Sequence, residues 1–264
     1  MSSITQRGAT GPLGITANGT FQSSTDANNL TLVGTRWDLS DGRELVLVST
    51  SSATTTTPGF LYQEPALIAN HQGLTVTGFT PYGTTGGVAN SSSTPATVTV
   101  TLGATALTVN QYQGGFLIVQ SGPGIGQTLR IAENPVALSS ATGVVITLED
   151  GPNVALTTSS VVSLYPAVGA NVIVSPTTPT NVSAGISLYP IAASSYGFLV
   201  AKGIVGAVFD ATVATAGQSI SPSVTTAGTV TLATASGTAL TKEILGATTI
   251  TSTSAAAYPV FINI

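Results

Sequence analysis

The chain has 264 residues, of which 42% are hydrophobic and only 6% are charged, and its formal net charge is −4. An ordinary globular protein carries about 25% charged residues, so another group must solvate this surface. The 44 Thr and 28 Ser can do so, and the β-branched side chain of threonine favours sheets.

The same composition excludes several classes of function. The six basic residues are scattered, so they form no electrostatic footprint for DNA or RNA. The chain has no cysteine and His71 is its single histidine, which excludes disulfides, thiol chemistry and a Cys/His zinc site. The first residues lack the apolar core of a secretory signal, and no apolar run is long enough to span a membrane. We therefore expect a protein that is neither exported nor bound to a membrane, and that needs no cofactor.

Residues 1–22 are rich in glycine, threonine, serine and asparagine and show no apolar periodicity. We expect an extended N-terminal arm that becomes ordered against a partner, where it adds main-chain hydrogen bonds to a sheet edge. Thr5, Gln6 and Arg7 are the candidate partner-binding residues of this arm, and Arg7 is its sole charged residue.

A β-hairpin is predicted in residues 31–50. Asp41-Gly42 is typical of a two-residue turn, and the strand that follows is apolar on both faces, which indicates burial on each side. Trp37, the single tryptophan, lies beside this turn. Tryptophan more often fills a core, but its place next to a polar hairpin makes it a candidate partner contact.

From residue 60 to 165, short runs of Val, Thr, Leu and Ile alternate with glycine and proline, a pattern typical of a barrel or sandwich. Similar runs follow residue 183 and end in an apolar strand at Ile264, which should pair within the fold. We expect an all-β protein whose antiparallel barrel or sandwich lobes follow an extended arm. The expected parts are an arm at 1–22, a first lobe at 23–165 and a second lobe at 166–264, with at most one short helix around 239–245.

Few side chains could carry out catalysis, and each has a structural explanation. Asp38, Asp41 and Glu44 come closest to an acidic cluster, but turn chemistry explains Asp41, and the hairpin places Asp38 across from Glu44. Their spacing lacks the regular oxygen ligands of a calcium loop. Glu149 and Asp150 are adjacent on a strand that ends in a turn, so they point to opposite faces.

Two further motifs are equally weak as catalytic signals. The glycine-rich stretch 122–126 lacks the Rossmann spacing and the Walker lysine and precedes a strand, which favours a β-turn. His71 has no second histidine or cysteine to share a metal, and no nucleophile-elbow sequence accompanies it. We expect His71 to be a hydrogen-bonded histidine in a loop or interface. The sequence predicts no enzymatic activity and no metal.

Longer runs of the sequence carry a resemblance to a known family. The stretches GFLYQEPALIANHQGL, from Gly59, and GGFLIVQSGPGIGQTLRIAENP, from Gly114, resemble structural proteins of tailed bacteriophages, in particular head decoration (cement) proteins. The likeness covers roughly residues 30–264. The motifs that carry it are Gly34-Thr35-Arg36, Asp41-Gly42-Arg43-Glu44, Asn70-His71-Gln72 and Gly114-Gly115-Phe116. Many members continue the first Ser-Leu-x-Pro with Asn-Pro-Tyr, where this chain has Ala167-Val168-Gly169.

The resemblance implies a role in the virion and carries no catalytic residue with it. A decoration protein would bind the outside of the major capsid shell and stabilise it, after synthesis in the host cytoplasm. A homotrimer would match the local three-fold positions of the shell. The expected capsid contacts are the arm and the loops near Trp37. The alternative is a tail-fibre or adhesin module that binds host-surface glycans, which would need aromatic and acidic side chains clustered in a groove.

Overall fold

The computed structural model describes residues 4–5, 33–81, 95–210, 215–233, 243–251 and 256–264. Within these ranges the regular structure is β-strand apart from one 3-10 turn, η2 (Ala69–His71). No helix among the described residues is long and apolar enough to cross a membrane. The expected all-β fold is confirmed, because both sheets are antiparallel and one of them closes into a barrel.

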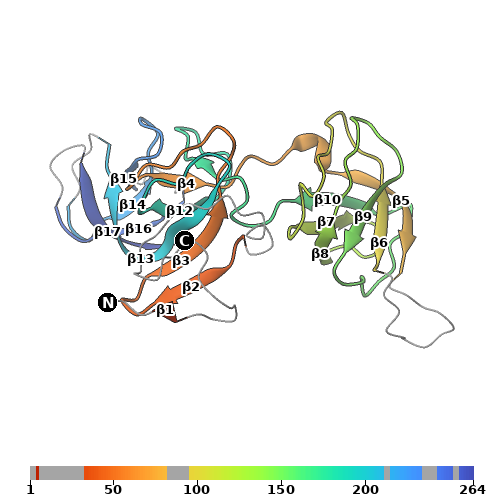
Figure 1. Ribbon diagram of the computed structural model, residues 1–264, viewed down its shortest axis with the longest axis horizontal. Coiled ribbons are helices and arrows are strands. Elements are labelled where there is room, and N and C mark those ends of the chain that lie inside the picture. The colour runs from red at the N-terminus through yellow and green to blue at the C-terminus, as the bar shows by residue number, and fades with distance from the viewer. Residues whose placement is uncertain (1–3, 6–32, 82–94, 211–214, 234–242, 252–255) are drawn as a thin grey trace. The chain divides into compact units, whose positions relative to one another are not determined.

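The chain folds into two compact units (Figure 1). Unit 1 combines Met1–Ala66 with Val168–Ile264, and unit 2 is Leu67–Ala167. Unit 2 is therefore inserted into unit 1, which corrects the expected contiguous lobes at 23–165 and 166–264. The physical reason is long-range strand pairing: β3 (Glu44–Ser49) pairs with β13 (Tyr196–Val208), so the early hairpin belongs to the same sheet as the end of the chain.

In the described part of the chain, unit 1 is one sheet of eleven strands. Its main path runs β1-β2-β3-β13-β17-β16-β14-β15, while β12 bonds to β13 and β4, and β11 bonds to β4. Strand β17 lies between β13 and β16, which confirms that the C-terminal strand pairs within the fold. The other strands are β1 (Ile4–Thr5), β2 (Arg36–Leu39), β4 (Leu61–Gln63), β11 (Ile173–Val174), β12 (Ser183–Ser187), β14 (Ser219–Pro222), β15 (Val230–Leu232), β16 (Gly246–Thr248) and β17 (Ala257–Asn263).

Strand β3 is central because both of its faces are apolar, as the sequence predicts. Leu45 and Leu47 belong to a core cluster on one face, and Val46 and Val48 belong to a second cluster on the other. All four side chains are at most 2% exposed. A strand buried on both faces needs neighbours on both edges, and β2 and β13 supply them.

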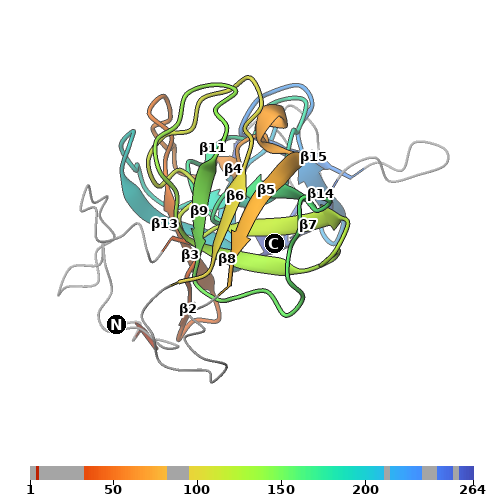
Figure 2. The same cartoon turned by 90° about the vertical axis from the view of Figure 1, so that its right-hand side faces the viewer.

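Unit 2 is a closed antiparallel barrel with the strand order β10-β5-β6-β9-β8-β7. Strand β10 is labelled in Figure 1, and the other strands of the barrel are also labelled in Figure 2. The strands are β5 (Leu74–Thr80), β6 (Thr97–Val100), β7 (Phe116–Ser121), β8 (Thr128–Glu133), β9 (Val144–Leu148) and β10 (Val161–Tyr165). Val98 and Val100 of β6 point into the core, while Thr97 and Thr99 alternate with them and are partly exposed. Threonine on the outward face of the strands thus explains how a chain with so few charges solvates its barrel.

Only two residues of the predicted arm fall within the described ranges. Ile4 and Thr5 form β1 and pair antiparallel with Leu39 and Asp38 of β2. These two residues therefore pair with a sheet edge of their own chain, whereas the prediction places the arm against a partner. Gln6 and Arg7 lie outside the described residues, as do residues 239–242 of the helix expected at 239–245.

Candidate functional site

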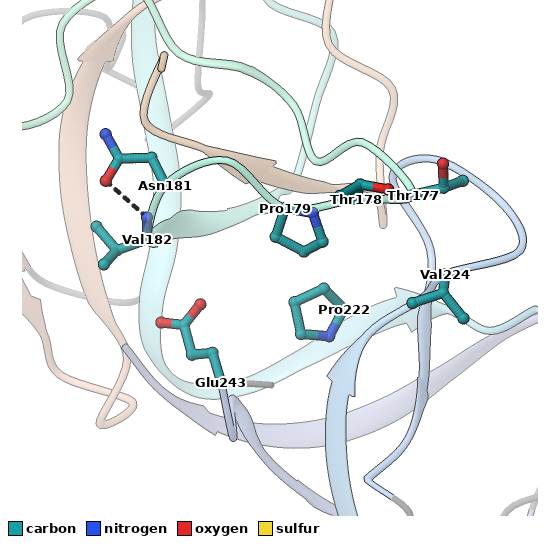
Figure 3. A pocket seen from close by; sticks show the side chains of 8 residues that line it. All are labelled: Thr177, Thr178, Pro179, Asn181, Val182, Pro222, Val224 and Glu243. Carbon is teal, nitrogen blue, oxygen red and sulfur yellow. Dashed lines mark hydrogen bonds between the residues drawn. The ribbon is translucent and has the colours of Figure 1, made fainter. Parts of the chain in front are cut away.

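Unit 1 carries a surface groove of ≈ 550 Å³ beside the start of β12 (Figure 3). Pro179 and Pro222 face each other across this groove, and Val224 lies at one end. We call it the proline groove. Its lining residues are Thr177, Thr178, Pro179, Asn181, Val182, Pro222, Val224 and Glu243.

Glu243 is the one titratable side chain among the lining residues of the proline groove. The N–H of Ser183 donates a hydrogen bond to its Oε2 at 3.0 Å, which holds the carboxylate at the start of β12. Asn181 is held on both sides, because its Nδ2 donates to the Pro65 carbonyl at 2.8 Å and its Oδ1 accepts from the Val182 N–H at 2.9 Å. Among the described lining residues, Glu243 is therefore a carboxylate held in place by the main chain, with no basic side chain beside it.

A smaller cavity of ≈ 200 Å³ adjoins the proline groove, and the two share Val182 and Glu243. We call it the Glu64 cavity. Its inner wall is apolar and buried, whereas its rim reaches the surface at Val182, which is 55% exposed. The lining residues are Arg36, Val46, Val48, Glu64, Val168, Gly169, Val182, Ser183, Ala184, Glu243 and Ile264.

Glu64 follows β4 directly and is only 3% exposed. Its N–H donates to the Val182 carbonyl at 3.0 Å, and its Oε1 accepts a hydrogen bond from the Gly169 N–H at 2.7 Å. Its Oε2 is buried and has no hydrogen-bond partner among the described residues. Burial raises the pKa of Glu64 to about 7, against the opposing effect of the Gly169 bond. Buried polar atoms are nearly always paired, so this carboxylate oxygen is exceptional.

Arg36 lies at the rim of the Glu64 cavity but does not neutralise Glu64. Its Nη1 donates to Glu44 Oε1 at 2.7 Å and to the Ile264 carbonyl at 3.2 Å. The guanidinium is thus committed to a carboxylate of β3. Glu64 therefore forms no ion pair among the described residues.

Sequence reasoning missed both Glu64 and Glu243. Glu64 lies between a short apolar strand and Pro65, a position that local pattern assigns to an exposed loop end. Its burial comes from Gly169 and from Val182, which are more than 100 residues away in sequence. The one local signal is an isolated acid inside the apolar run from Phe60 to Ile68.

The acids of the early hairpin have the structural roles that the sequence predicts. Asp38 and Glu44 are register partners in β2 and β3. Asp41 accepts from Arg43 Nη2 at 2.6 Å, and this guanidinium lowers the pKa of the Asp41 carboxyl. Among the described residues, no group of three His, Cys, Asp or Glu side chains is placed to hold a metal ion.

His71 is fully buried in unit 2, and it is hydrogen-bonded as expected. Its Nε2 lies 3.1 Å from the Thr105 carbonyl, which can only accept, so Nε2 carries the proton. In the neutral ring, Nδ1 then accepts from the Tyr112 hydroxyl at 2.7 Å. Both ring nitrogens are therefore used within the barrel, and the role is structural.

The glycine-rich stretch 122–126 forms the turn between β7 and β8, as predicted. The Ile125 N–H donates to the Gly122 carbonyl at 3.1 Å, and a strand rather than a helix follows.

Unit 2 also has a hollow of ≈ 650 Å³ beside the C-terminal end of β9. Its lining residues are Phe79, Pro81, Glu149, Asp150, Gly151, Pro152, Asn153 and Ala155. The sequence predicts that Glu149 and Asp150 point to opposite faces of a strand, but β9 ends at Leu148 and both acids line this hollow.

The structure corrects the expected role of Trp37 as a partner contact. The side chain is 2% exposed and packs edge-on against Phe198, with ring centroids 5.0 Å apart. A ring buried in the core of unit 1 has no surface to offer to a partner. Thr5 lies in β1, and Gln6 and Arg7 fall outside the described residues.

Comparison of the chain with protein-family models, with curated proteins and with solved structures finds no match in any of the three.

Proposed function

We propose that the chain is a structural protein of a tailed-phage head, a decoration protein that binds the outside of the major capsid shell and stabilises it. The observation that carries the proposal is an apolar sheet face on β13 and β17. Ile204 and Phe261 are register partners there and are 59% and 45% exposed. A side-chain face with this composition is typical of an interaction surface.

We call this surface the β13–β17 face and define it by its three register pairs. They are Lys202 with Asn263, Ile204 with Phe261, and Gly206 with Pro259. Lys202 is its one charged residue, so contacts made by this face would be little screened by salt. The closed barrel of unit 2 and the paired strands of unit 1 also present a fixed surface. A fixed surface loses little conformational entropy when it binds a partner. The sequence resemblance to head decoration proteins points to the same role.

Shell attachment tests the proposal. The full-length protein should co-sediment with phage shells that lack their decoration protein, and Phe261→Ser should weaken attachment by about tenfold because a buried aromatic ring is lost from the interface. Leu138→Ser is the matched control, since Leu138 is 80% exposed but lies in unit 2. Deleting residues 2–22 should also weaken attachment. If neither Phe261→Ser nor the deletion of residues 2–22 changes attachment, the proposed contacts are contradicted.

The proposed assembly is a homotrimer, because three weak contacts acting together match a three-fold position of the shell. Light scattering should give three times the mass of one chain at micromolar concentration. A monomer in solution, together with single separated copies on particles imaged by electron cryo-microscopy, would contradict the trimer.

One observation favours the adhesin alternative. The hollow of unit 2 gathers a partly buried aromatic residue, Phe79, two exposed acids, Glu149 and Asp150, and Asn153. Aromatic and acidic side chains in one groove are the combination expected of a glycan site. If the full-length protein ignores shells and instead co-sediments with phage tails or host cells, the adhesin function replaces decoration.

A further inference from the structure

The Glu64 cavity contains a carboxylate whose chemistry the proposed role at a phage head does not use. Glu64 lies among buried apolar side chains, and its Oε2 has no partner in the described part of the chain. Glu243, at the rim, is a second carboxylate, and Arg36 is already bonded to Glu44. The buried atom of the cavity that has no partner among the described residues is therefore an acceptor, and it carries negative charge when Glu64 is ionised.

We propose that the Glu64 cavity binds an alkylammonium group, a charged primary amine carried on an unbranched alkyl chain. The ammonium would donate to Glu64 Oε2. The alkyl chain would lie along Val46, Val48 and Val168, toward Glu243. This inference stands independently of the role at the phage head.

The walls of the cavity fit this class of ligand. Val46, Val48 and Val168 are apolar and offer contact to methylene groups but no ligand atoms to a metal. A calcium ion takes six to eight oxygen ligands, which two separate carboxylates do not supply. The volume of ≈ 200 Å³ corresponds to about six water molecules, and n-butylammonium has five non-hydrogen atoms.

The energetics favour a weak but specific site. A buried carboxylate without a partner is costly, so a ligand that supplies a charge-assisted hydrogen bond relieves that cost. Against this, the ligand must part the side chains that cover Oε2, which limits the affinity to the order of millimolar. Binding requires the ionised form of Glu64. Since the pKa of Glu64 is raised to about 7, the affinity should be about tenfold higher at pH 8 than at pH 6.

A nuclear magnetic resonance titration of the full-length protein tests the inference. The probe is n-butylammonium chloride, and the reporter is the amide signal of Gly169, whose N–H donates to Glu64 Oε1. Tetramethylammonium chloride at equal ionic strength is the control, because it carries the same charge but has no N–H to donate. We expect a saturable shift of the Gly169 signal with n-butylammonium alone.

Two variants locate the site. Glu64→Gln should abolish the saturable shift, whereas Glu149→Gln, which removes an exposed carboxylate of unit 2, should leave it unchanged. The fluorescence of Trp37 verifies that unit 1 of each variant is folded. If Glu64→Gln folds and the Gly169 signal still shows a saturable shift with n-butylammonium, the assignment to Glu64 is overturned.

The remaining outcomes separate the sources of the amine and the rival ligand. If N-acetyl-lysine methylamide binds as tightly as n-butylammonium, the cavity accepts a lysine side chain of a partner protein; if only the free amine binds, it accepts a small molecule. Both results support the inference. No saturable response to either amine, or displacement of n-butylammonium by millimolar Ca²⁺, would overturn it.

Discussion

Replacing Glu64 by glutamine should raise the free energy of unfolding of unit 1 by about 3 kcal/mol at pH 8 and leave it nearly unchanged at pH 4. The pKa of Glu64 is raised from 4.5 to about 7 in the folded protein because the carboxyl is buried. The folded state therefore holds a proton that the unfolded state releases between these two pH values. The stability that protonation contributes is complete below pH 4.5 and is lost as the pH rises through 7.

Urea unfolding at several pH values measures this effect. Trp37 is the single tryptophan and lies in the core of unit 1, so its fluorescence follows the relevant transition. In the wild-type protein the free energy of unfolding should fall between pH 4.5 and pH 7, and Glu64→Gln should flatten this slope. Glu149→Gln is the control, because its side chain is 43% exposed and its pairing with Arg130 contributes little. Equal slopes in the wild type and in Glu64→Gln would show that Glu64 ionises without cost.

Local pattern predicted the strands but not their partners. The Asp41-Gly42 turn and the two apolar faces of residues 44–48 are short-range signals, and the structure has the hairpin and the central strand that they indicate. The turn itself differs from the predicted two-residue turn, because residues 40–42 connect Leu39 to Arg43. The pairing of β3 with β13 joins residues about 150 positions apart. Alternation along a strand specifies which face is buried but not which strand lies beside it, so the insertion of unit 2 could not be predicted.

The same distinction separates the functional residues. His71 could be predicted to be hydrogen-bonded because a lone histidine has few other uses, and its partners Tyr112 and Thr105 confirm this. Glu64 could not be predicted, since its burial depends on Gly169, which follows the inserted unit in the sequence. The polar hairpin beside Trp37 predicts a partner contact. Its burial depends instead on Phe198, which packs against it and belongs to β13, a strand distant in the sequence.

Replacing Gly115 by alanine should destabilise unit 2 by about 3 kcal/mol, because the new methyl group would meet main-chain atoms. A Cβ atom at Gly115 would overlap the carbonyl oxygen of Tyr165 and lie 2.8 Å from the nitrogen of Ala167. Phe116, the next residue, is the register partner of Tyr165 in β10. Neither strand can yield without breaking ladder hydrogen bonds, so the close approach of the two strands requires glycine at position 115.

Gly126→Ala is the matched control for this steric argument. Gly126 has a φ of +85° but no atom within 4 Å of its Cβ position, so alanine there should cost only about 1 kcal/mol of backbone strain. Calorimetry should therefore show a much larger loss of stability in Gly115→Ala than in Gly126→Ala. The transition followed by Trp37 should stay unchanged in both, since Trp37 belongs to the separate core of unit 1. Equal losses in the two variants would mean that β7 and β10 can separate at this end of the barrel, and that the close approach is not what makes glycine necessary.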